Sequence, residues 1–227
     1  MTDRCTNFET LLASRPVFVA DGAMGTTLFS LGLEGGGCPE LLNIEQPELV
    51  AQVHERFVAA GADIVLTNTF GGNARRLALH RLADRVAELN AAAVRIARQV
   101  ADAADRPVAV AGSIGPTGDL FEPLGPLTHE EGVAVFLEQA AALVEAGVDV
   151  LWIETISSWE ELNAATEAAS RLRVPVSATL SFDTNGRTMM GISGSQLGEW
   201  WRASPHAPLS VGANCGIGPG DAVSVAL

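Results

Sequence analysis

The stretch THEEGVAVFLEQAAALVEAGVDVLWIET, residues 128–155, decides the fold. It opens with a capping box, Thr128 with Glu131, which satisfies backbone amides at the start of a helix. The alanine-rich segment that follows has helical periodicity, and Gly147 comes after it, where glycine adopts a left-handed turn without penalty. An aspartate and the apolar run Val150 to Glu154 come next. The stretch therefore predicts a helix followed directly by a buried strand that ends in a carboxylate.

The same kind of unit recurs along the chain. Apolar, β-branched runs predict strands at Val17 to Ala20, Ile64 to Thr67, Val108 to Ala111, Val150 to Glu154, Val176 to Leu180 and Leu209 to Ala213. Helical periodicity predicts helices at Pro47 to Ala60, Asp84 to Ala104, His129 to Ala146 and Ser158 to Arg171. Ser158 with Glu161 forms a second capping box, and Gly61-Ala-Asp63 repeats the pattern Gly147-Val-Asp149. This alternation indicates a parallel βα series.

Two architectures fit such a series, a doubly wound sheet and a (β/α)8 barrel. A dinucleotide-binding sheet would carry Gly-x-Gly-x-x-Gly after its first strand, and the turn here reads Asp21-Gly-Ala-Met-Gly. Polar, glycine-rich stretches follow one strand after another, and barrel enzymes place their sites on those loops. We therefore expect an α/β fold of the TIM type, with residues 1–227 forming one barrel domain of about six βα units that lacks the last two.

Composition excludes several classes of partner. The 227 residues carry a formal net charge of −13, and all 14 basic residues are arginines without a basic cluster, which argues against nucleic acid and anionic membrane surfaces. No apolar stretch has the length of a spanning helix, and the N-terminus lacks a signal peptide's apolar centre, so we expect a cytoplasmic protein. The three cysteines, Cys5, Cys38 and Cys215, form no CxxC pair and no disulfide framework.

Polar residues gather where the predicted strands end. If the strands are parallel neighbours, Asp21, Glu154, Asn214 and Cys215 face one rim. Asp21 is open to two interpretations, a turn cap or a site residue. Glu154 closes an otherwise apolar strand, and a buried carboxylate needs a cationic ligand or hydrogen-bond donors. Cys215 is either an inert thiol or a reactive one in an exposed, glycine-dense turn.

Other conspicuous residues favour structural interpretations. Trp200 and Trp201 lie in a predicted helix and are expected to pack against neighbours. Asp183 and Arg187 are expected to lie in a solvated turn.

Five motifs follow the strands in order: Asp21-Gly-Ala-Met-Gly-Thr, Thr67-Asn-Thr-Phe, Gly112-Ser-Ile-Gly-Pro-Thr-Gly, Glu154-Thr-Ile-Ser and Gly212-Ala-Asn-Cys-Gly. Together they resemble the homocysteine S-methyltransferase family over essentially the whole chain, and bacterial betaine-homocysteine methyltransferases most closely.

The resemblance implies zinc-dependent methyl transfer from a cationic donor, betaine or S-methylmethionine, to the thiol of homocysteine, giving methionine. Cys215 matches a zinc ligand of the family. Asp21 and Glu154 would line the homocysteine site, with Glu154 taking the ammonium group. The amides around Gly22 and Ala23 would hold the carboxylate, and Asn214 would order the rim. Bound zinc would deprotonate the substrate thiol.

The donor stays open at this stage. A quaternary ammonium usually needs an aromatic cage, and the chain has no tyrosine. Phe70 and Trp152 are the nearest aromatic candidates. A cobalamin donor would require further domains.

The sequence departs from the family at the metal. The family's other two zinc ligands form a Gly-Gly-Cys-Cys motif that this chain lacks, and Cys38 is a weak substitute. We therefore expect the 227-residue chain alone to hold zinc poorly, to be inactive, and to need a complementing chain or an oligomer. The alternative function is a non-catalytic barrel fragment that binds a partner supplying the missing strands and zinc ligands.

Overall fold

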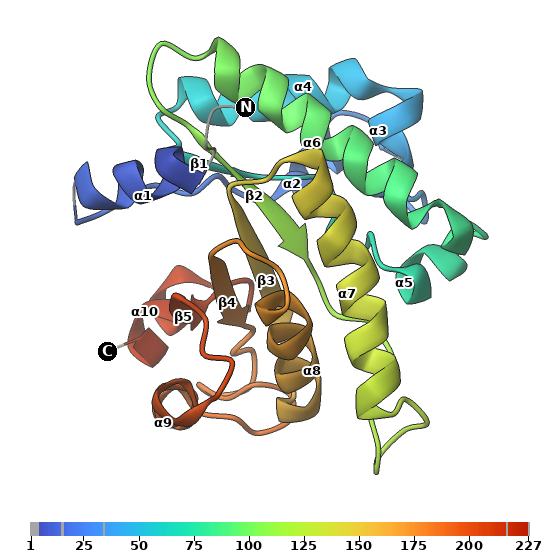
Figure 1. The fold of residues 1–227 in the computed structure, drawn as a ribbon, viewed down its shortest axis with the longest axis vertical. Coiled ribbons are helices and arrows are strands. Elements are labelled where there is room, and N and C mark those ends of the chain that lie inside the picture. Colours follow the sequence, from blue (N-terminus) through green and yellow to red (C-terminus); the bar gives the residue numbers. More distant parts are fainter. Residues whose placement is uncertain (1–4, 15, 34, 217, 227) are drawn as a thin grey trace.

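The computed structural model describes residues 5–14, 16–33, 35–216 and 218–226. These residues form a parallel sheet with helices between its strands (Figure 1). The strands are β1 (Ile64–Leu66), β2 (Ala109–Ile114), β3 (Val150–Ile156), β4 (Val176–Leu180) and β5 (Ser210–Ala213). The α-helices are α1 (Cys5–Ser14), α2 (Met24–Ser30), α3 (Leu42–Glu45), α4 (Pro47–Ala59), α5 (Ala74–Ala78), α6 (Val86–Ala103), α7 (His129–Ala146), α8 (Trp159–Ser170), α9 (Gly194–Ala203) and α10 (Pro219–Ala226). Two short 3₁₀ helices are η1 (Pro39–Leu41) and η2 (Ala83–Arg85).

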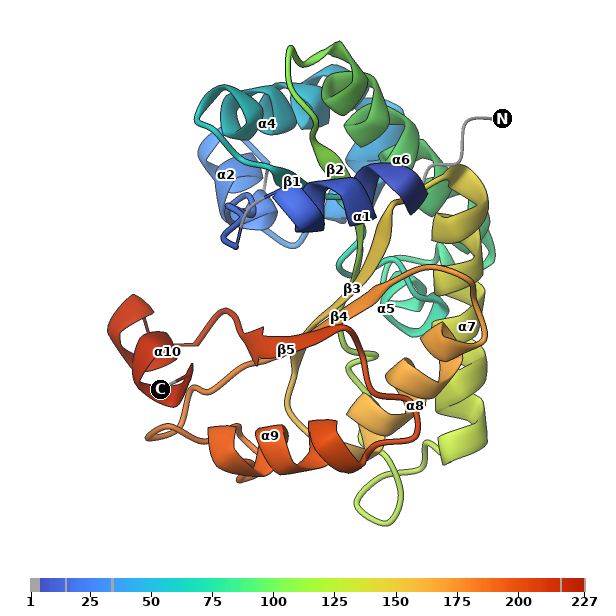
Figure 2. The same ribbon diagram turned by 60° about the vertical axis from the view of Figure 1, so that its left-hand side comes forward.

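The five strands pair in sequence order, β1-β2-β3-β4-β5, and every pair is parallel. Figure 2 shows the sheet as an open arc with α6, α7 and α8 on its outer side. No pairing joins β5 back to β1 among the described residues. The arrangement is an incomplete parallel barrel, which confirms the predicted fold class. None of the helices described here is long and apolar enough to cross a membrane.

The two faces of the sheet bury different clusters. The outer face, with Val110, Leu151 and Ile153, packs against the helices in the largest apolar cluster. The inner face, with Ala111 and Val150, packs against a smaller cluster that includes side chains of α1. Because α1 touches the inner face near the amino ends of the strands, it covers that end of the barrel interior.

The predicted helices lie where the periodicity placed them, to within a few residues. The first predicted strand is wrong. Residues 17–20 form only one isolated bridge, Ala20 with Ile64, so the sheet has five strands instead of six. Val17 and Val19 are 70% and 56% exposed. This segment pairs on one side only among the described residues, which leaves its apolar side chains without the cover that a buried strand receives.

Asp149 ties the helix–strand unit that decided the fold to its neighbour. Gly147 has φ +102° and ends α7 in the left-handed conformation, as predicted. Asp149 Oδ2 then accepts hydrogen bonds from the Val110 amide at 2.7 Å and from Arg98 Nη2 at 2.6 Å. A buried carboxylate therefore joins the amino end of β3 to β2 and to α6.

Asp63 repeats the device one unit earlier. Gly61 has φ +105°, and Asp63 Oδ2 accepts a hydrogen bond from the Val19 amide at 2.9 Å. Arg106 pairs with the other carboxylate oxygen of Asp63 at 3.4 Å. The repeated Gly-x-Asp pattern is thus a structural clamp at the amino ends of neighbouring strands.

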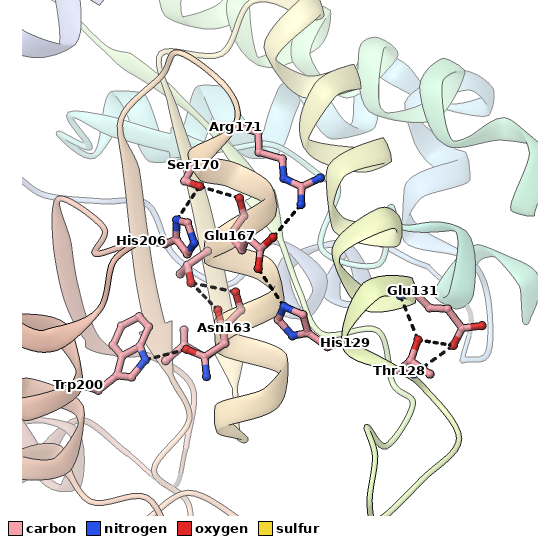
Figure 3. Close-up of polar contacts among 11 residues, drawn as sticks. Thr128, His129, Glu131, Asn163, Glu167, Ser170, Arg171, Trp200 and His206 are labelled. Carbon is pink, nitrogen blue, oxygen red and sulfur yellow. Dashed lines mark hydrogen bonds and ion pairs between the residues drawn. The ribbon is translucent and has the colours of Figure 1, made fainter.

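The two predicted capping boxes differ. Thr128 and Glu131 make both reciprocal bonds at the start of α7 (Figure 3). At α8, Ser158 accepts from the Glu161 amide, but the Glu161 carboxylate does not return to Ser158. It accepts instead from the amide and hydroxyl of Thr117, at 2.8 and 2.7 Å. The second box is therefore only half formed, because its glutamate anchors the loop after β2.

The outward side of α8 carries polar contacts to both neighbouring helices (Figure 3). Glu167 lies 2.9 Å from His129 at the start of α7. Asn163 accepts a hydrogen bond from Trp200 of α9 at 2.8 Å, and Trp200 stacks on Trp159 with ring centroids 6.1 Å apart. Trp201 donates to the Pro208 carbonyl. Trp200 packs against the large apolar cluster, as expected, whereas Trp201 is 37% exposed.

Candidate active site at the carboxyl ends of the strands

The predicted site residues lie at the carboxyl ends of the strands. Asp21 follows the segment that bridges to β1, Glu154 lies near the end of β3, and Asn214 and Cys215 follow β5. Hydrogen bonds connect Glu154, Asn214 and Cys215, and the charge of Glu154 acts on Asp21. Arg187 and Asp183 take no part in this group and lie in an exposed turn after β4, where Arg187 donates to the Gly191 carbonyl.

Glu154 is half-buried on the inner face and is held at both oxygens. Ser113 Oγ donates to Glu154 Oε1 at 2.5 Å, and Asn214 Nδ2 donates to Oε2 at 3.0 Å. Neither donor carries a positive charge. Burial raises the pKa of Glu154, and the hydrogen bond from Ser113 lowers it in part. A cationic ligand group placed here would favour the ionised carboxylate.

Asp21 is a second acid at the same rim. Its Oδ2 accepts a hydrogen bond from the Leu66 amide at 2.9 Å. Burial raises the pKa of Asp21 to about 7, the Leu66 hydrogen bond opposes the rise, and the charge of Glu154 adds to it. Burial and repulsion from Glu154 both favour the protonated form of Asp21, and a cation at the rim would favour the ionised carboxylate.

Thr155 bends the end of β3. Its φ is +64°, in the left-handed region that β-branched residues rarely enter. The β3–β4 register shifts between Ile153 and Ile156 at this point. Alternation would place Glu154 and Ile156 on the same face, yet Ile156 packs in the outer cluster while Glu154 meets Ser113. Glu154 keeps the inner-face position of Val150 and Trp152, and the irregularity at Thr155 turns Ile156 to the outer core.

Thr155 also connects β3 to the end of β5, across β4. Its amide donates to Asn214 Oδ1 at 2.9 Å, and Asn214 Nδ2 donates to its hydroxyl oxygen at 2.8 Å. The Thr155 hydroxyl lies 3.3 Å from the sulfur of Cys215, which is exposed and has φ +54°. Asn214 thus contacts both the Glu154 carboxylate and the Cys215 thiol.

Sequence reasoning did not identify Ser113 and Thr155. Ser113 had a usable signal: Ala109, Ala111 and Ser113 alternate toward the inner face, and the serine is the polar one at the carboxyl end. Thr155 had none, because a β-branched residue after an apolar run is typical of a continuing strand.

Gly22 and Ala23 lie beside Asp21, at the entry to α2, and both are exposed. Ala23 is the residue before α2, and no side chain caps this helix. A Cβ on Gly22 would approach the Phe57 ring to 2.9 Å, so a larger residue here would require that ring to shift. The amide groups at this position are free of a side-chain cap.

The described residues do not form a zinc site by themselves. No group of three His, Cys, Asp or Glu side chains in this part of the chain could hold a metal ion. The Cys215 sulfur lies beside Thr155 and Asn214, which are not usual zinc ligands. Cys38 is buried and donates to Glu40 Oε2 at 3.3 Å, and burial raises its pKa to about 11, which disfavours the thiolate that zinc requires.

The two aromatic candidates are placed differently. Trp152 is half-buried against the inner cluster, two residues before Glu154. Phe70 is 37% exposed and lies over Gly115, where an added Cβ would meet the Phe70 ring at 2.7 Å. The contacts do not bring these two rings together into a cage.

A protein-family model described as homocysteine S-methyltransferase matches residues 18–225. The chain is 34% identical over 226 residues to a methionine synthase of Mycobacterium tuberculosis (strain ATCC 25618 / H37Rv), covering 92% of this chain and 18% of that protein. A methionine synthase of Mycobacterium leprae (strain TN) is 33% identical, with 95% and 19% covered. The chain therefore spans less than a fifth of these relatives.

Solved structures agree with the architecture. The metallated form of the homocysteine methyltransferase MmuM from Escherichia coli superimposes with a TM-score of 0.82 at 23% identity, covering 96% of this chain and 81% of that one. Its oxidized form gives a TM-score of 0.78 at 24% identity, with 92% and 77% covered. At these identities the likeness concerns the fold.

Proposed function

Because the chain belongs to the homocysteine S-methyltransferase family, we propose that its rim site binds homocysteine and directs the thiol at a methyl group on a cationic donor. The observation that carries the proposal is the half-buried carboxylate of Glu154, held by two neutral donors and close enough to Asp21 for their charges to interact. Such a carboxylate is suited to a ligand that supplies a positive charge.

Glu154 would bind the substrate's ammonium group. Its oxygens already accept from Ser113 and Asn214, and each keeps a lone pair for a further donor. Pairing with an ammonium group would offset the burial that now disfavours the charged form. Asp21 would add negative potential at the same rim.

The substrate's carboxylate would lie at the backbone amides around Gly22 and Ala23. These amides precede α2, whose first turn has no side-chain cap. Amides at a helix start attract anions. Ammonium and carboxylate groups share one carbon of homocysteine, so these contacts would hold the same end of the substrate and leave the thiol, at the far end of the side chain, free to react.

Methyl transfer would leave the donor's nitrogen or sulfur atom uncharged. The bond from the homocysteine sulfur to the methyl carbon forms as the carbon–nitrogen bond of betaine or the carbon–sulfur bond of S-methylmethionine breaks. The electron pair of the broken bond stays on the donor atom, and the thiol proton passes to solvent. The product is methionine. Two acids at the rim favour a cationic donor over a neutral one.

Zinc enters the proposal through Cys215 alone. This thiol is exposed at the rim and would be one ligand, while the described residues lack the others that a catalytic zinc needs. We propose that residues 1–227 act as one homocysteine-binding unit in the cytoplasm, with the remaining ligands supplied from outside the described residues, for example by a complementing chain or an oligomer.

The test is a pair of calorimetric titrations. Glu154→Gln should weaken homocysteine binding by about 2–4 kcal/mol, because it removes one partner of a buried charge pair. Glutamine keeps the shape, so the fold should survive. The control ligand is 4-mercaptobutanoate, which lacks the ammonium group and should bind the two proteins alike. Equal homocysteine affinity for both proteins would refute the role of Glu154.

A further inference from the structure

We propose that Ser113 is a positioning residue for this site: its hydroxyl holds the Glu154 carboxylate in the orientation that receives a ligand's ammonium group. The inference deepens the proposed function and rests on it for the identity of the ligand. It does not rest on it for the contact between Ser113 and Glu154, which can be tested without any substrate.

The contact is short and partly buried. Ser113 is 1% exposed, and its Oγ lies 2.5 Å from Glu154 Oε1. Hydroxyl-to-carboxylate bonds of about 2.5–2.7 Å are charge-assisted and roughly twice as strong as bonds between neutral groups. Glu154 is half-buried, so water does not easily replace this donor.

The backbone of Ser113 is fixed by side chains from two other elements. Its amide donates to Thr67 Oγ1 at 3.1 Å, and its carbonyl accepts from Thr69 Oγ1 at 2.7 Å. Gln139 of α7, which is fully buried, donates to the same carbonyl at 3.3 Å and to the Thr69 carbonyl at 2.7 Å. The two threonine hydroxyls lie 2.6 Å apart. Ser113 therefore cannot follow a moving Glu154, and the carboxylate is held to a rigid frame.

The hydroxyl also opposes the effect that neutralises Glu154. Burial raises the pKa of Glu154, and the hydrogen bond from Ser113 lowers it. Ser113 stabilises the charged form, and Asn214 is the other donor. Without the hydroxyl the carboxyl group shifts toward its protonated form, which cannot pair with an ammonium group.

The experiment compares the wild-type chain with Ser113→Ala, Ser113→Cys and Ser113→Thr. The titration of the Glu154 carboxyl is followed by carbon-13 NMR with labelled glutamate, and homocysteine affinity by calorimetry at one pH. Ser113→Ala should raise the pKa of Glu154 by about 1 and weaken homocysteine about tenfold. Ser113→Cys, whose thiol is a weak donor of similar shape, should show most of both changes. Ser113→Thr keeps a hydroxyl, so its Glu154 pKa and its homocysteine affinity should equal those of the wild type.

Thr117→Ala is the matched control. Thr117 donates its hydroxyl to the buried Glu161 carboxylate at 2.7 Å, the same kind of bond in another part of the molecule. Burial raises the pKa of Glu161, and the Thr117 bonds lower it. The control should raise the pKa of Glu161 and leave Glu154 and homocysteine binding unchanged.

The outcomes separate the two ideas. An unchanged Glu154 titration in folded Ser113→Ala or Ser113→Cys overturns the role of Ser113. A second result would also overturn it: Glu154→Gln weakens homocysteine binding, but Ser113→Ala leaves it unchanged. If the Glu154 titration shifts as expected but the wild type binds no homocysteine, Ser113 keeps its role in holding the carboxylate, and the proposed function is the part that fails.

Discussion

Thr155 carries a backbone cost that its neighbours offset. A left-handed backbone costs an L-residue about 1–2 kcal/mol, and Thr155 has φ +64°. Its amide and hydroxyl are engaged by Asn214, and the hydroxyl also reaches Cys215. Backbone strain of this kind concentrates at functional sites. It persists only where contacts with the surrounding structure fix the strained conformation. The site geometry is thus maintained at the expense of local stability.

This strain reverses the usual order of two substitutions. Thr155→Gly and Thr155→Ala both remove the hydroxyl, but only glycine relieves the left-handed backbone. We expect Thr155→Gly to be more stable than Thr155→Ala by about 0.5–1 kcal/mol, after allowance for glycine's greater entropy loss on folding. Urea unfolding measures the difference. At Thr179, which is buried in β4, the alanine variant should be the more stable one. The same order at both positions would contradict the strain.

At the scale of elements, two kinds of local device fix how helices meet strands. Glycine ends α7 in the left-handed conformation, and an aspartate two residues later ties the next strand to its neighbour. Arg98 of α6 joins the same carboxylate. This arrangement buries the opposite charges of Asp149 and Arg98, and it stabilises the fold only while both partners are present.

Asp149→Asn should therefore destabilise the fold strongly. Asp149 is 1% exposed, and its loss leaves Arg98, whose side chain is 14% exposed, without its buried partner. We expect a loss of about 3–5 kcal/mol in the free energy of unfolding. Asp102→Asn is the control, because Asp102 pairs with the same arginine at 3.7 Å but is 67% exposed. That change should cost at most about 1 kcal/mol. Equal losses for the two variants would show that the clamp adds nothing.

At the scale of the whole molecule, acid stability depends on a histidine that has no role in the site. His54 of α4 is fully buried, and neither ring nitrogen has a hydrogen-bond partner in the described structure. Burial lowers its pKa from 6.5 to about 4. Between these two values the unfolded chain binds a proton that the folded chain does not, so this group lowers stability as pH falls from about 6.5 toward 4. Above pH 6.5 it has no such effect.

His54→Leu should remove this loss. Relative to the variant, the wild type should lose about 3 kcal/mol between pH 7 and pH 4. The comparison with the variant is needed because Asp21, Glu154 and Glu161 have raised pKa values and act in the opposite direction on acidification. Urea unfolding at a series of pH values measures it. His80→Leu, at an exposed position, is the control for replacing a histidine by leucine. Parallel curves for wild type and His54→Leu would refute the assignment.

The sequence predicts those features that local signals determine. Helix periodicity, the cap at Thr128 and the left-handed glycines located the main helices. Parallel order then brought Glu154, Asn214 and Cys215 to one rim without any structure. The run at 17–20 reads like the other strands, but a strand also needs partners on its edges, and pairing is not local. The left-handed backbone of Thr155 could not be predicted for the same reason. Contacts with Asn214, which is distant in the sequence, set this conformation, and threonine rarely adopts it.

Asp149 has a consequence far from where it lies. By holding the amide of Val110, it sets the stagger of β3 against β2, with Ala111 opposite Val150 and Ser113 opposite Trp152. A slide of one residue would turn every side chain of one strand to the opposite face. Ser113 and Glu154 would then point to different sides of the sheet. A contact at the amino ends of β2 and β3 therefore determines how Ser113 and Glu154 face each other at the carboxyl ends of these strands.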